Sequence, residues 1–256
     1  MPTSRTVLIS TVQFESDLRA GAVSFVDVIE CAKRLGVDGV EFRDVYWRDR
    51  DHDIATVRPR LSDLGLIATY ATFVTLFDAT ENRDKLRQAV DEAAALGSPL
   101  LRIFPGSVPA AADSGAWSAA ERAIDDAASK GVRIALENFA GTPGSRLAEV
   151  KAVLDRIHSP SLGTNLDTGN YAQNGQDLAE AIQALGDRIV STHLKDVKDT
   201  PNGITSTYLG DGKLPFADLF SQLDRLPQKI LHCFEFGGGG DSEGRIKKSL
   251  DLLKSL

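Results

Sequence analysis

The chain has 256 residues, 42% of them apolar, which suits one closed α/β domain and excludes a disordered or fibrous protein. Its 29 Lys and Arg against 36 Asp and Glu give a formal net charge of −7, and no basic run occurs, so nucleic acids and anionic membranes are poor candidates for partners. No apolar run approaches the ~20 residues of a membrane span and residues 1–10 lack a signal-peptide core, so we expect a cytoplasmic protein with a small-molecule ligand.

In chain order, short runs rich in β-branched and apolar residues alternate with longer segments of helical periodicity. The expected strands are Val7–Val12, Gly39–Phe42, Ile67–Ala71, Leu100–Phe104, Val132–Glu137, Leu162–Asp167, Ile189–Lys195 and Ile230–Phe236. The clearest expected helices are Ser24–Leu35, Arg83–Leu96 and Ala116–Lys130. A glycine follows each of these helices, in the position of a left-handed C-cap.

This strand–helix alternation requires parallel pairing, and eight such units in about 250 residues predict a (β/α)8 TIM barrel. A doubly wound sheet would have fewer strands and a glycine-rich turn after the first one, but the turn here is Gln13-Phe14-Glu15-Ser16. There is no linker, low-complexity tract or repeat beyond the alternation itself. We therefore expect one domain over residues 1–256.

The two cysteines, Cys31 and Cys233, lie in a helix-like and a strand-like segment. They form no CxxC motif, so a disulfide framework or a zinc knuckle is not favoured. We expect both to be buried, reduced thiols of the core.

Four successive strands end in polar groups, although buried parallel strands are normally almost all apolar. Alternation along each strand places Glu137, Asp167, His193 and Glu235 on the inward face, at the carboxyl ends where barrel enzymes keep their chemistry. A lone Glu or His at such a place is usually structural, but three neighbouring buried carboxylates without a cation would be strongly unfavourable. The four together predict a metal site, whose oxygen-rich donors suit Mn²⁺ or Mg²⁺, with Co²⁺ or Zn²⁺ also compatible.

The motifs at these strand ends resemble those of the sugar phosphate isomerase/epimerase superfamily of xylose-isomerase-like barrels. They are Leu-Glu-Asn (136–138), Asp-Thr-Gly-Asn (167–170), His-Leu-Lys-Asp (193–196), Leu-Gly-Asp-Gly (209–212) and Phe-Glu-Phe (234–236), with further similarity at 36–42 and 101–106. The resemblance implies that Glu137, Asp167, His193 and Glu235 ligate a divalent metal. It also implies that Glu137 and Glu235 are the acid/base pair on opposite faces of the substrate.

The resemblance does not specify the substrate. The superfamily includes ketose 3-epimerases, hydroxypyruvate isomerases, inosose and dehydroshikimate dehydratases, lyases and DNA-cutting members. Asn170 stands where the ketose epimerases commonly have a His that touches substrate, which argues against a free-ketose epimerase but not against an isomerase or a lyase. The DNA-repair members use several histidines for a multinuclear zinc site, whereas this chain has four in total, so a nuclease is not expected.

Such a site would chelate an α-hydroxy carbonyl compound and stabilise the enediolate that forms when the α-proton leaves. Glu137 or Glu235 would take the proton and the other would return it. Return to the opposite face is epimerisation, return to the neighbouring carbon is isomerisation, and loss of a β-leaving group is a lyase or dehydratase reaction. A non-catalytic sugar-binding or partner subunit is the alternative from another class, although the complete set of four ligands argues against it.

Other inward polar residues are candidates for substrate contact. Lys195, two residues after His193, is expected to be catalytic because its ammonium could stabilise the oxyanion, and the superfamily's His-x-Lys pattern suggests that place. Expected substrate-binding residues are Glu41, Arg102, Asn138 and Asn170. For the charged ones, a layer of buried ion pairs is an equally good interpretation. The long segment 197–214 is expected to be a lid or an interface, and a homo-oligomer is compatible with the sequence.

Overall fold

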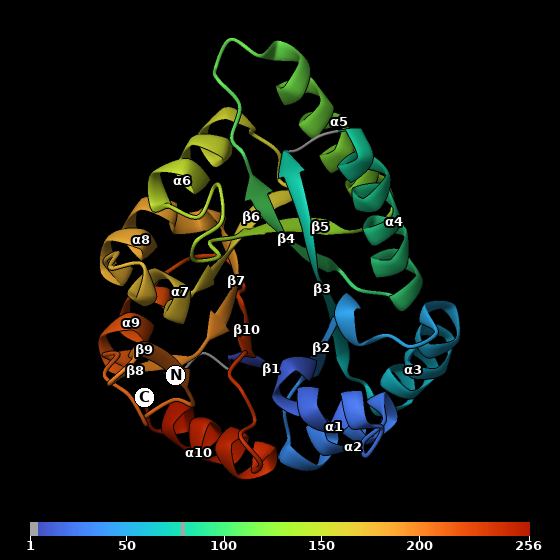
Figure 1. Cartoon of the computed structure of the whole chain (residues 1–256), viewed down its shortest axis with the longest axis vertical. Helices are drawn as coiled ribbons and strands as arrows, with labels where there is room; N and C mark the ends of the chain where they lie inside the picture. The colour runs from blue at the N-terminus through green and yellow to red at the C-terminus, as the bar shows by residue number, and fades with distance from the viewer. Residues whose placement is uncertain (1–4, 78–79) are drawn as a thin grey trace.

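The computed structural model describes residues 5–77 and 80–256. In this part of the chain eight parallel strands close into a barrel in the order β1-β10-β7-β6-β5-β4-β3-β2, and helices surround it (Figure 1). The barrel strands are β1 (Thr6–Ser10), β2 (Gly39–Arg43), β3 (Ile67–Phe77), β4 (Leu100–Gly106), β5 (Arg133–Glu137), β6 (Leu162–Asp167), β7 (Ile189–Leu194) and β10 (Leu231–Phe234). The predicted (β/α)8 TIM barrel is confirmed.

The helices alternate with the strands along the chain and pack outside the barrel. They are α1 (Glu15–Ala20), α2 (Phe25–Leu35), α3 (Arg50–Leu64), α4 (Thr80–Leu96), α5 (Ser114–Ser129), α6 (Leu147–Arg156), α7 (Thr168–Gln173), α8 (Leu178–Leu185), α9 (Phe216–Leu223) and α10 (Ser242–Ser255). In α2, Ser24 and Asp27 form a reciprocal capping box, and Gly36 ends the helix with φ 72°. The expected start at Ser24 is therefore the N-cap, one residue before the helix.

The outer faces of the strands pack against the helices and form the main apolar core. Inside the barrel, a separate small apolar cluster contains Leu100, Ala135 and Val190, with Leu231 packed against it. Towards the carboxyl ends of the strands the inward side chains become polar and charged, among them Glu41, Arg102 and Asp167. The barrel interior thus has an apolar layer near the amino ends of the strands and a charged layer near their carboxyl ends.

The segment after β7 differs from the expected loop. Residues 196–207 form an antiparallel hairpin of β8 (Asp196–Thr200) and β9 (Gly203–Thr207). Its turn contains Pro201, Asn202 and Gly203, typical turn residues, and Gly203 has φ 111°. The role of residues 197–214 as a lid or an interface stays a prediction.

The buried carboxylate of Asp196 fixes the segment that follows the hairpin. It accepts backbone hydrogen bonds from four residues, Val197, Gly210, Gly212 and Leu214, at 2.8–3.1 Å. The Leu-Gly-Asp-Gly motif therefore has a structural explanation, because its amides wrap around one charge.

Two further expectations concern the chain as a whole. Cys31 and Cys233 are buried free thiols, as predicted. Among the described residues, none of the helices has the length and apolar character needed to cross a bilayer.

Candidate active site

The four predicted metal ligands enter the barrel mouth from four strand ends. Glu137 and Asp167 are the last residues of β5 and β6, His193 lies in β7 beside Asp167 in the register, and Glu235 directly follows β10. All four are at most 7% exposed. Glu137, Asp167 and His193 each offer a ligand atom, and these atoms lie within 4.8 Å of one another.

Glu235 joins this cluster through Lys195. The Lys195 Nζ lies 2.7 Å from Asp167 Oδ2 and 2.5 Å from Glu235 Oε2, so these two carboxylate oxygens are no more than about 5 Å apart. The structure thus brings together the four predicted ligands and the predicted catalytic lysine.

His193 has a different environment at each ring nitrogen. Its Nε2 lies 2.7 Å from Glu41 Oε2. Its Nδ1 lies 2.8 Å from Glu137 Oε2 and 3.8 Å from Asp167 Oδ2. The angles at Nδ1 do not suit a hydrogen bond to any of the described groups. A buried ring nitrogen that faces two carboxylate oxygens fits a divalent cation, and a carboxylate on the other nitrogen is the usual means of orienting a metal-ligating His. The donor set therefore fits the predicted metal.

A second group of potential ligands lies on the other side of His193. Glu41, His193 and Cys233 also place ligand atoms within 4.8 Å of one another. Burial, together with the charges of Glu41 and Glu235, raises the pKa of the Cys233 thiol well above its ordinary value, so the thiolate that a metal needs is disfavoured. We therefore take Glu137, Asp167 and His193 as the better site, with Glu41 orienting the imidazole.

Buried cations balance the carboxylates. Arg102 Nε lies 3.1 Å from Glu137 Oε2, and Arg43 Nη1 lies 2.6 Å from Glu235 Oε1. Together with Lys195, they supply positive charge next to the acids, so burial of these carboxylates does not by itself require a metal. Support for a metal comes instead from the orientation of His193 and its neighbours.

These charges set the protonation states of the acids. Burial alone would raise the pKa of Glu137, but Arg102 and His193 hold it well below its usual range. Burial likewise opposes ionisation of Glu235, yet Lys195, His193 and Arg43 lower its pKa to about 2. At Asp167, burial and the neighbouring Glu137 and Glu235 outweigh Lys195 and raise the pKa to about 6. Glu137 and Glu235 are therefore ionised at neutral pH.

The expected substrate-binding residues all contact the cluster itself. Glu41 and Arg102 pair with His193 and Glu137 as described. Asn170 Nδ2 donates to Glu137 Oε1 at 3.2 Å, and Asn138 Oδ1 accepts from the Asp167 amide at 3.1 Å.

One supporting residue was not assigned a role from the sequence. Asn165 Nδ2 donates to Glu137 Oε2 at 2.9 Å, and Ser191 Oγ donates to Asn165 Oδ1 at 2.8 Å. The sequence pattern does indicate an inward position for Asn165, because strand alternation places it on the same face as Asp167.

An aromatic group borders the charged layer. Phe73 is 48% exposed and packs against Phe104 and Phe139, with ring centroids 5.7 and 6.2 Å away. The guanidinium of Arg43 lies 5.2 Å from the centroid of the Phe73 ring. Phe73 therefore offers an exposed apolar surface beside the ion pairs.

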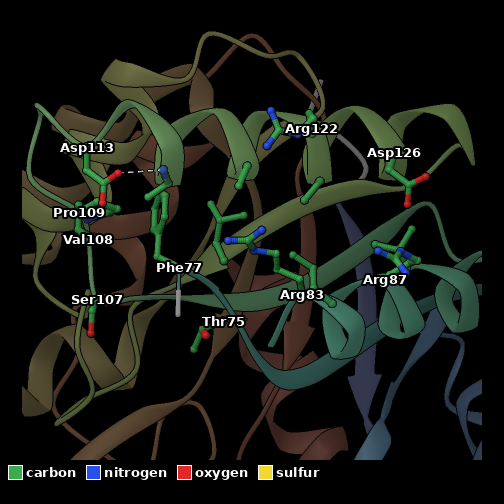
Figure 2. A pocket seen from close by; sticks show the side chains of 16 residues that line it. Thr75, Phe77, Arg83, Arg87, Ser107, Val108, Pro109, Asp113, Arg122 and Asp126 are labelled. Carbon is green, nitrogen blue, oxygen red and sulfur yellow. Dashed lines mark hydrogen bonds between the residues drawn. The ribbon is translucent and has the colours of Figure 1, made fainter. Parts of the chain in front are cut away.

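A groove of about 690 Å³ lies elsewhere, outside the barrel between α4 and α5 (Figure 2). Figure 2 shows Arg83 and Arg87 on one side and Arg122 and Asp126 on the other. The groove shares no residue with the carboxylate cluster, so we place the chemistry at the barrel mouth.

Comparison with known proteins assigns the family. The model of the xylose isomerase-like TIM barrel family matches residues 29–256. The chain belongs to this family. One relative is an L-ribulose 3-epimerase from Methylomonas sp. (strain DH-1), 30% identical over 211 residues that cover 76% of this chain and 70% of the relative. The superfamily resemblance noted in the sequence is thereby confirmed.

Solved structures show the same fold. A D-allulose 3-epimerase from Methylomonas sp. in complex with D-allulose has a TM-score of 0.77 and 23% identity, covering 99% of this chain and 98% of that one. The probable 3-DHS dehydratase AsbF from Bacillus anthracis has a TM-score of 0.76 and 18% identity, covering 97% and 98%. Because an epimerase and a probable dehydratase share this barrel fold, the fold alone does not define the reaction.

Proposed function

We propose that the protein is a divalent-metal-dependent epimerase or isomerase of a small sugar or hydroxy-ketone. The observation that carries the proposal is the arrangement at His193, whose buried Nδ1 faces carboxylate oxygens of both Glu137 and Asp167. The 30% identity to an L-ribulose 3-epimerase supports the same class of substrate. Mn²⁺ or Mg²⁺ suits the carboxylate-rich donors, and Glu137, Asp167, His193 and Glu235 would hold the ion.

When bound, the ion would supply positive charge beside the carbonyl and hydroxyl oxygens of the substrate. Glu137 and Glu235 provide the two bases. They enter from β5 and β10, which are separated in the barrel by β6 and β7, so they approach the mouth from different sides. One ionised carboxylate removes the α-proton and later releases it to solvent. The other, protonated from solvent, delivers a proton to the opposite face or to the neighbouring carbon.

Neighbouring side chains keep these bases in place. Asn170 and Asn165 each hold one oxygen of Glu137, and Arg43 and Lys195 hold the two oxygens of Glu235. The Lys195 ammonium is also placed to offset negative charge that develops on a substrate oxygen. Burial of the whole cluster strengthens the electrostatic interactions among these charged groups.

The test uses the purified protein loaded with Mn²⁺ and incubated in D₂O with L-ribulose or D-allulose. We expect an epimeric or isomeric sugar with deuterium at the carbon next to the carbonyl, and loss of this activity after chelation. As a control, Asp126→Asn, on the outer groove, should keep full activity.

Two outcomes would overturn the proposal. Loss of water with a new conjugated chromophore, given by 3-dehydroshikimate or a keto-cyclitol but not by the ketoses, would make the protein a lyase or dehydratase. Sugar binding without turnover, in protein that takes up no divalent metal, would make it a non-catalytic binding subunit.

A further inference from the structure

Three consecutive residues contact Lys195 at different points along its length. Asp167 faces the ammonium, with its Oδ2 2.7 Å from Nζ. Thr168 Oγ1 accepts from the Lys195 backbone amide at 3.1 Å and donates to the Lys195 carbonyl at 2.7 Å. Gly169 lies against the aliphatic stem. We call residues 167–169 the lysine seat.

Gly169 contributes to this seat by lacking a side chain. A Cβ added there would lie 2.5 Å from Lys195 Cγ, 2.8 Å from Cε and 2.9 Å from Cδ, closer than real Cβ contacts. The contact involves the root of the lysine stem as well as its outer carbons. A movement of the lysine stem that relieves it also moves Nζ from its position beside Asp167 and Glu235.

The backbone gives no other reason for a glycine at this position. Gly169 lies in α7 and is not among the glycines with positive φ. At an ordinary helical position alanine is favoured over glycine, because glycine loses more backbone freedom on folding. A glycine at this helical position is explained by the space that the Lys195 stem occupies, which a Cβ would fill.

We propose that Gly169 is a positioning residue, whose missing side chain allows the Lys195 ammonium to reach between Asp167 and Glu235. The catalytic consequence rests on the function proposed above, whereas the packing consequence does not. Thr168 fixes the backbone of Lys195, and Gly169 fixes the direction in which its stem leaves that backbone.

The packing experiment measures the effect of Gly169→Ala on the melting temperature in three full-length backgrounds: wild type, Lys195→Met and Lys195→Ala. Methionine keeps a stem of similar length without the charge, and alanine removes the stem. In the Lys195→Ala background we expect Gly169→Ala to raise the melting temperature by about 2–4 °C, because only the helical preference remains. In the wild-type and Lys195→Met backgrounds it should lower the melting temperature or leave it unchanged. An equal rise in all three backgrounds would overturn the proposal.

The catalytic experiment uses the ketose assay on the same proteins with matched metal content. Gly169→Ala should reduce kcat at least tenfold in wild type, with KM changed less than twofold, and cause no further loss in Lys195→Ala. Gly237→Ala is the control, since a Cβ at Gly237 meets nothing within 4 Å, and it should leave kcat unchanged. Equal losses in wild type and Lys195→Ala would overturn the positioning role. Absence of turnover in every protein would refute the proposed function and leave the melting-temperature result as the test of packing.

Discussion

Arg102 pairs with the proposed base Glu137 inside the barrel, and we predict that Arg102→Met strongly destabilises the protein. The Arg102 side chain is 1% exposed, its Nε lies 3.1 Å from Glu137 Oε2, and its Nη1 donates to the Thr72 carbonyl at 2.7 Å. Methionine preserves much of the packing against Phe104 but leaves the Glu137 carboxylate and the Thr72 carbonyl without this cation. Removing one partner of a buried ion pair costs about 3–5 kcal/mol.

Equilibrium unfolding in urea at pH 7 measures this loss. Arg122→Met, an exposed arginine on the outer groove, is the control and should change the free energy of unfolding by less than about 0.5 kcal/mol. Adding Glu137→Gln to Arg102→Met should recover part of the loss, because it removes the uncompensated charge. A loss below about 1 kcal/mol for Arg102→Met, or no recovery in the double variant, would refute the assignment of Arg102 as the main counter-charge of Glu137.

Three further predictions concern His232, Asp196 and Lys195. Burial lowers the pKa of His232 to about 4, below its ordinary 6.5, so the unfolded state binds more protons than the folded state in this pH range. The free energy of unfolding should therefore fall by up to about 3 kcal/mol as the pH is lowered from 6.5 to 4. In urea titrations across this range, His232→Gln should make that fall smaller. Asp196→Ala removes the acceptor of four backbone amides and should speed hydrogen exchange at Gly210 and Gly212 at least tenfold, whereas unchanged exchange would show that the loop is held by other contacts. Lys195→Ala should lower turnover far more than it lowers Mn²⁺ content, and parallel loss of metal would make Lys195 a structural residue.

The barrel could be predicted from the sequence because the βα alternation and the glycines that end the helices are local signals. The bounds of several strands differed where tertiary contacts decide. β3 continues to Phe77 past a register shift between Ala71 and Thr75, for example. The sequence predicts a loop over the β8–β9 hairpin, because its two strands contain only two apolar residues, Val197 and Ile204.

At the site, strand alternation correctly predicted that Glu137, Asp167, His193 and Glu235 would converge. Strand alternation could not predict which ion pairs and hydrogen bonds the inward side chains form. Arg102 pairs with Glu137 on the neighbouring strand, and Arg43 pairs with Glu235, which follows the next strand but one. In both pairs the two residues are far apart in the sequence. The space beside Gly169 likewise depends on a neighbouring strand that no local pattern specifies.

The central claim is that Glu137 and Glu235 act as two bases at one metal centre. Its most direct test is Glu235→Gln, with turnover and α-proton exchange followed by NMR in D₂O at full metal loading. The glutamine amide oxygen remains a weak ligand but cannot accept the proton, so substrate should still bind while turnover falls about 10²–10⁴-fold. Exchange of the proton that faces Glu137 should persist. A fully loaded Glu235→Gln protein with near-normal turnover on its substrate would contradict the two-base mechanism.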